Sequence, residues 1–64
     1  MYQAIFIING TEYVKEIDAK TDELAKRDFL RLWNKRRPAR GYAQGWLMKE
    51  WNECIRQVDE LGGL

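Results

Sequence analysis

The chain has 64 residues, with 11 lysines and arginines against 10 aspartates and glutamates, one cysteine and no histidine. This length allows one domain, residues 1–64, and a chain of this size buries only about 60% of its unfolded surface, so we expect marginal stability. A single cysteine forms no intrachain disulfide, and the lack of histidine excludes most metal sites, which leaves core packing or self-association as sources of stability.

The first predicted element is a β-hairpin. Two apolar runs flank Asn9-Gly10, a dipeptide that readily takes the two positive φ angles of a type I′ turn. A two-residue loop sets the register, so that Ile8 pairs with Thr11 and Tyr2 pairs with Ile17. The face with the larger side chains is predicted to meet the core; it consists of Tyr2, Ala4, Phe6, Ile8, Thr11, Tyr13, Lys15 and Ile17.

The opposite face of the hairpin is half polar. It carries Ile5, Ile7 and Val14 among the polar residues Gln3, Glu12 and Glu16. The three apolar residues would form a small exposed patch unless something covers them. A two-stranded sheet is weak by itself, so we expect self-association through this patch or through the open strand edge, and a homodimer would carry two basic segments.

A helix is predicted from about residue 22 to residue 36. Thr21 is a suitable N-cap, and the acidic residues at 22 and 23 follow it where the helix dipole favours negative charge. Pro38 ends the segment, because the residue before a proline disfavours helical geometry. Successive residues of a helix are about 100° apart, so this segment would have an apolar side and a basic side. The apolar side holds Ala25, Phe29, Leu32 and Trp33, and the basic side holds Arg27, Arg31 and Lys35.

The last segment has the most regular apolar spacing in the chain. One helical arc holds Leu47, Trp51, Cys54, Ile55, Val58 and Leu61, which predicts a second helix over residues 45–61. The alternative is a third strand over residues 54–61, but a regular strand would place Ile55 and Val58 on opposite faces. We therefore favour an α+β domain of order ββαα, with two helices over one face of the hairpin, and keep ββαβ as the alternative.

The tryptophans divide between core and surface. Trp33 and Trp51 fall within apolar helical arcs and are predicted core residues. Trp46 precedes its arc, which makes it the best candidate for an exposed aromatic side chain.

Catalytic chemistry has little support in this sequence. It contains no serine and no histidine, and Cys54 lies on an apolar arc, where we expect a small buried side chain. Close acidic pairs such as Glu50 with Glu53 are typical of a solvated helix surface, and the glycines at 41 and 45 lack the spacing of a phosphate loop. We expect neither an enzyme nor a bound metal or cofactor.

The charges are unevenly distributed along the chain. Residues 1–25 hold two Lys/Arg against five Asp/Glu (−3), residues 26–40 seven against one (+6), and residues 41–64 two against four (−2). The basic residues and two neighbouring aromatics form the candidate binding site: Arg27, Arg31, Lys35, Arg36, Arg37, Arg40, Tyr42 and Trp46. Such cations bind phosphate, and such aromatics stack on bases or fill a pocket of a partner protein. A solvated helix end, where the dipole favours cations, explains the same residues without a ligand.

Two binding functions fit this segment. The first is a small module that contacts nucleic acid, and the second is an inhibitor or adaptor that docks on an acidic surface of a nucleic-acid-handling protein. The plan of a hairpin followed by a helix, in a small chain without a catalytic set, is similar to that of many phage and mobile-element accessory proteins that inhibit host machinery by occupying a surface. No motif carries this likeness, so it transfers no residue roles.

The N-terminal MYQAIFIING becomes polar too soon for a signal peptide or membrane span, so we expect a cytoplasmic protein without a membrane partner.

Overall fold

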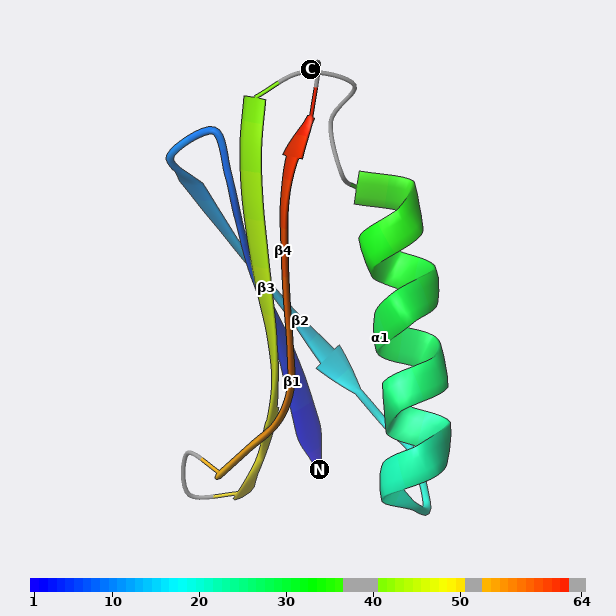
Figure 1. Ribbon diagram of the computed structural model, residues 1–64. Coiled ribbons are helices and arrows are strands. Elements are labelled where there is room, and N and C mark those ends of the chain that lie inside the picture. The colour runs from blue at the N-terminus through cyan, green and yellow to red at the C-terminus, as the bar shows by residue number, and fades with distance from the viewer. Residues whose placement is uncertain (37–40, 51–52, 63–64) are drawn as a thin grey trace.

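The computed structural model describes residues 1–36, 41–50 and 53–62, and of residues 60–62 the backbone alone. The elements follow the order β1 (Tyr2–Ile8), β2 (Thr11–Ile17), α1 (Asp22–Arg36), β3 (Gly41–Lys49) and β4 (Glu53–Gly62). These strands form one antiparallel sheet in the order β2-β1-β3-β4, and α1 lies along one of its faces (Figure 1).

The predicted hairpin is confirmed. Asn9 and Gly10 have φ angles of 49° and 86°, as a type I′ turn requires, and the register runs from Ile8–Thr11 to Tyr2–Ile17. On the face predicted to meet the core, the β1 side chains are buried or partly buried, and Ile17 is buried as well. The other β2 side chains of that face are exposed, because β2 is an edge strand.

The predicted helix over residues 22–36 is also confirmed. Thr21 caps it, since its Oγ1 accepts a hydrogen bond from the Leu24 amide at 3.2 Å. Ala25, Phe29 and Trp33 are buried against the sheet, as their spacing predicted, and Leu32 is partly buried. Trp33 is therefore a core residue, whereas Trp51 lies outside the described residues.

The predicted second helix over residues 45–61 is wrong. The chain forms two strands there: β3 pairs with β1, and β4 pairs with β3. The alternative ββαβ order is wrong as well, because two strands follow α1, although it did assign residues 54–61 to a strand. The element order is ββαββ.

A β-bulge explains the helix-like spacing in β4. Leu47 pairs with Arg56 and Met48 with Cys54, so Ile55 is an extra residue in β4. This irregularity lets Ile55 and Val58 both pack against the core, although a regular strand would put them on opposite faces. The apolar spacing that predicted a helix is therefore produced by a bulged strand.

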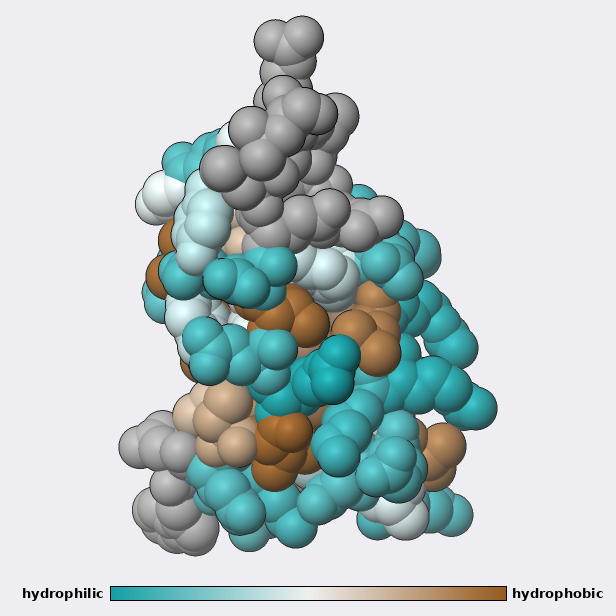
Figure 2. Space-filling model, viewed as in Figure 1, coloured by the Kyte–Doolittle hydropathy of each residue, from teal (hydrophilic) through white to brown (hydrophobic). Residues whose placement is uncertain are grey.

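The core lies between α1 and the two central strands. The rings of Phe6 and Phe29 stack with centroids 5.5 Å apart, and Trp33 packs against Phe6 at 6.2 Å. Figure 2 shows apolar side chains between the helix and the sheet, with hydrophilic side chains over the outer side of α1. In the part of the chain that the structure describes, no helix has the length and apolar character needed to cross a membrane.

Candidate binding surface

The sheet face turned away from α1, here called the open face, has an apolar row at its centre. Side chains alternate along strands, so the residues between the buried ones point away from the helix. In the register, Ile5 lies opposite Val14 on one side and opposite Trp46 on the other. The described residues of the open face are Gln3, Ile5, Ile7, Glu12, Val14, Glu16, Tyr42, Gln44, Trp46, Met48, Cys54, Gln57 and Asp59.

The apolar side chains of the open face are only partly covered. Val14 is 56% exposed and Tyr42 is 42% exposed, while Ile5, Ile7, Trp46 and Met48 have intermediate exposure. They stay accessible because α1, the helix of the described chain, packs on the other face (Figure 1). A contiguous apolar patch on the surface of a soluble protein marks an interaction site more often than isolated apolar residues do.

The charges of the open face have one sign. Glu12 and Glu16 lie on the edge strand β2, and Asp59 lies on the edge strand β4. The remaining polar positions are glutamines and a cysteine, and the described part of this face contains no lysine or arginine. The surface is thus an apolar centre between acidic edges.

The cations predicted to bind a ligand lie elsewhere. Arg27, Arg31, Lys35 and Arg36 are exposed, and the first three occupy the side of α1 opposite its buried residues. Arg31 lies 4.0 Å from the carboxylate of Asp28, and Arg36 lies over the ring of Tyr13 at 5.4 Å. Arg37 and Arg40 are outside the described residues.

The predicted site is therefore divided. Tyr42 and Trp46 belong to the open face, so the sheet lies between them and the cations of α1. Trp46 has intermediate exposure, and it joins Ile5, Ile7 and Val14, the residues predicted from the hairpin alone to form a separate patch. Met48 and the three carboxylates were not among the predicted site residues. A weak alternation in residues 43–48 was the signal that could have revealed them, since Ala43, Gly45 and Leu47 are buried while Gln44, Trp46 and Met48 are partly exposed.

Tyr42 is held in place by the hairpin turn. Its amide donates to Asn9 Oδ1 at 3.0 Å, and the Asn9 amide donates to the Tyr42 carbonyl at 2.9 Å. Gln44 Nε2 donates to the Tyr42 hydroxyl at 2.8 Å. The two bonds with Asn9 attach the start of β3 to the β1–β2 turn, and the bond from Gln44 orients the Tyr42 ring at this end of the open face.

A polar cluster joins β1, β3 and the start of α1 on the helix side of the sheet. The Tyr2 hydroxyl donates to Asp22 Oδ1 at 2.5 Å, and Lys49 Nζ lies 3.3 Å from the same oxygen. The hydrogen bond to Asp22 raises the pKa of Tyr2, and the bonds from Tyr2 and then Lys49 lower the pKa of Asp22. The pKa of Lys49 is raised by its bond to Asp22. The hydrogen bond and the ion pair therefore connect the start of β1 and the end of β3 to the first turn of α1.

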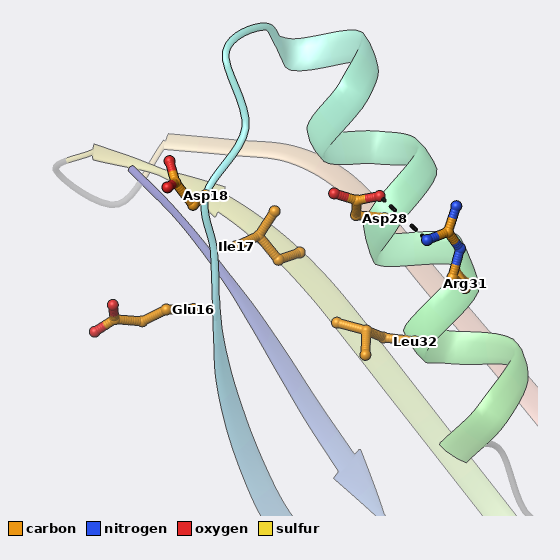
Figure 3. A pocket seen from close by; sticks show the side chains of 6 residues that line it. All are labelled: Glu16, Ile17, Asp18, Asp28, Arg31 and Leu32. Carbon is orange, nitrogen blue, oxygen red and sulfur yellow. Dashed lines mark ion pairs between the residues drawn. The ribbon is translucent and has the colours of Figure 1, made fainter.

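A shallow pocket of about 240 Å³ lies between the end of β2 and α1. Ile17 and Leu32 point toward each other across it, Asp28 and Arg31 form an ion pair at its rim, and Glu16 and Asp18 turn away from the helix (Figure 3). Among the described residues there is no group of three or more metal-ligating side chains. The pocket lacks the converging polar groups that a small-molecule site needs.

The prediction of a buried Cys54 is wrong. Its side chain is exposed on β4, opposite Met48, and its thiol approaches the Arg56 carbonyl at 3.4 Å. The bulge causes this error, because it turns Cys54 to the open face while Ile55 approaches the core.

Comparison of the chain with protein-family models, with curated proteins and with solved structures gave no match.

Proposed function

We propose that this protein is a small cytoplasmic, non-enzymatic binding protein that contacts another protein through its open face. The observation that carries the proposal is the row formed by Val14, Ile5 and Trp46 on three adjacent strands. A partly exposed tryptophan on a central strand, beside the other apolar residues of this row, is the kind of side chain that forms an interface hot spot. Such a protein would act as an inhibitor or adaptor, by occupying a surface of its target.

Energetics favour a partner on this face. Apolar surface that is removed from water stabilises a complex by about 25 cal/mol per Å², although ordering and desolvation offset part of that gain. The core on the other side of the sheet is closed by α1, and no buried side-chain nitrogen or oxygen of the described residues lacks a hydrogen-bond partner. The open face is therefore available for binding without loss of the contacts that hold the fold.

Site-specific photo-crosslinking tests the proposal. A benzophenone side chain is placed at Val14 or at Lys15, which are adjacent and exposed but point to opposite sides of the sheet. In cells that produce the protein, we expect a protein adduct from position 14 and none from position 15.

Two variants provide the matched comparison for this experiment. Trp46→Ala should abolish the adduct from position 14, whereas Tyr13→Ala should leave it intact, since Tyr13 is exposed on the helix side. Equal adducts from both positions, or an adduct that survives Trp46→Ala, would disprove binding through the open face.

Nucleic-acid binding is a second candidate, carried by a different observation. Arg27, Arg31 and Lys35 repeat every four residues on the outer side of α1, and among the described residues no ion pair holds Arg27 or Lys35. Phosphate contacts from such a row would weaken steeply with salt. The aromatic residues of the open face would not add stacking, because they lie across the sheet from these cations.

Titration against labelled single- and double-stranded nucleic acid tests this candidate. Binding at low salt should fall with rising salt, and Arg27→Glu with Lys35→Glu should remove it. Lys15→Glu changes the charge of β2 instead of α1 and serves as the control. If no binding occurs at low salt, the nucleic-acid candidate is lost.

A further inference from the structure

We propose that the open face binds an amphipathic, cationic α-helix of its partner. This inference rests on the proposed function and adds the shape and charge of the element that would contact the face. It is carried by the charge pattern of the open face and by the width of the sheet.

The open face is slightly wider than one helix. Four strands with spacings of about 4.8 Å place the two edge strands about 14 Å apart. A helix with its side chains is about 10–12 Å across, so one helix covers the two central strands and brings long flanking side chains close to both edges. On the other face α1 shows this arrangement, with Ala25, Phe29 and Trp33 seated on the sheet. A second helix would complete three layers around one sheet.

The charges of the open face favour a basic partner. Glu12 and Glu16 flank the apolar row on one edge, and Asp59 lies on the other edge. A helix with an apolar ridge and lysine or arginine on both flanks would pair with these carboxylates. Nucleic acid would be repelled, because the described part of the face offers no cation to a phosphate.

A second copy of this chain fits the open face less well. A symmetric pair would place the same acidic edges against each other, since a two-fold interface repeats one surface on both partners. A head-to-tail pair would place the outer side of α1 on the sheet. That side carries Arg27, Arg31 and Lys35 where an apolar ridge is needed.

Synthetic peptides provide the first part of the test. The probe is an 18-residue helical peptide with a leucine ridge and lysine flanks. One control peptide has glutamate in place of lysine, and another has the same composition in an order that breaks the ridge. We expect the lysine peptide to shift backbone amide NMR signals of β1 and β3 in the full chain. Both controls should bind at least about tenfold more weakly than the lysine peptide. The glutamate peptide reverses the charge pairs with the acidic edges, each of which contributes modestly, and the reordered peptide lacks a continuous apolar ridge.

Charge reversal provides the second part. Glu12→Lys with Glu16→Lys should weaken the lysine peptide about tenfold and let the glutamate peptide bind. Both residues are exposed on an edge strand, so the variant should fold, as its circular dichroism spectrum would show. Glu23→Lys reverses one charge on α1, away from the open face, and should leave the affinity for both peptides unchanged. Unchanged affinity in the double variant, or NMR shifts confined to α1, would overturn the inference.

The crosslink from position 14 separates this inference from the proposed function. If Glu12→Lys with Glu16→Lys weakens a protein adduct that Glu23→Lys leaves intact, both proposals are supported. If the double variant leaves the adduct unchanged, the proposed function stands and the cationic helix is excluded. An adduct with a second copy of the chain also excludes it. If position 14 yields no protein adduct, the proposed function itself fails.

Discussion

The aromatic rings of Phe6 and Phe29 stack almost in parallel, with their planes 9° apart and their centroids separated by 5.5 Å. Phe6 comes from the central strand β1 and Phe29 from α1, so this pair joins the two layers of the molecule. Both side chains are fully buried. A chain this small has a small core, so its stability should be sensitive to the loss of either ring.

Replacing Phe29 with alanine should leave the chain largely unfolded at room temperature. Phe-to-Ala changes in a packed core cost about 3–5 kcal/mol, which is comparable to the total stability of a small domain. Leu24→Ala on the same helix is the control, since Leu24 is 37% exposed and its loss should cost about 0.5 kcal/mol. Urea unfolding followed by circular dichroism measures both, and a cooperative transition in Phe29→Ala similar to that of the wild type would contradict the prediction.

Gly45 should not tolerate a side chain. A Cβ at this position of β3 would lie 3.0 Å from Phe6, 3.1 Å from Val58 and 3.2 Å from Phe29. The two rings are fully buried and cannot move aside freely, so Gly45→Ala should lower the free energy of unfolding by about 1–3 kcal/mol.

The neighbouring residue gives the control for Gly45. Gln44→Ala changes the same strand on the open face and should shift the free energy of unfolding by only about 0.5 kcal/mol. Denaturant midpoints compare the two variants. If Gly45→Ala stabilised the protein, the close packing of α1 over β3 would be wrong.

The contact between Tyr2, Asp22 and Lys49 should make stability depend on pH at both ends of the scale. The pKa of Asp22 is lowered from its usual 3.8, so its contribution is complete above that pH and is lost as the pH falls through the folded-state value. The pKa values of Tyr2 and Lys49 are raised from 10.0 and 10.5, so their contributions are complete below pH 10.0 and are lost as the pH rises through the folded-state values.

Asp22→Asn isolates the acid side of this dependence. The variant should be less stable than the wild type at pH 7, and the difference should shrink as the pH falls below 3.8. Asp59→Asn is the control, because Asp59 lies on β4 and accepts no side-chain hydrogen bond from the described residues. Urea midpoints from pH 2.5 to pH 7, buffered at constant ionic strength, measure the effect; a constant difference over this range would refute it.

Cys54 should react with a thiol reagent in the folded protein. Its side chain is exposed, so the rate should lie within roughly tenfold of the rate in denaturant, whereas a buried thiol would react only after opening. The matched control is Ala43→Cys in a Cys54→Ala background, because Ala43 is 1% exposed on the neighbouring strand. Protection of Cys54 to the same degree as this control would show that it is buried.

The N-terminal half of the fold could be predicted from the sequence. Asn9-Gly10 encodes a turn whose geometry sets the register of β1 and β2, and Thr21 begins a helix whose apolar residues recur at helical spacing. These signals are local, because they depend on backbone preferences and on neighbours within a few residues. The partly exposed patch of Ile5, Ile7 and Val14 followed from strand alternation alone.

The C-terminal half could not be predicted in the same way. The core-facing positions of β3 include Ala43 and Gly45, which are small because Phe6 and Phe29 occupy the space above them, so the strand shows no strong hydrophobic alternation. In β4 the bulge at Ile55 replaces a period of two with a spacing that resembles a helix. Both features are consequences of packing against distant residues.

The sequence by itself determined the hairpin, the helix and the separation of a basic middle from acidic ends, because turns, caps and charge are encoded locally. Only the tertiary structure decided which surface these residues share. The pairing of β3 with β1 places Trp46 beside Ile5. It separates Trp46 from Arg27 and Lys35, with which the sequence pattern had predicted a common binding site. The physical reason is that pairing between strands joins residues about 40 positions apart, and this pairing depends on long-range packing that no local pattern records.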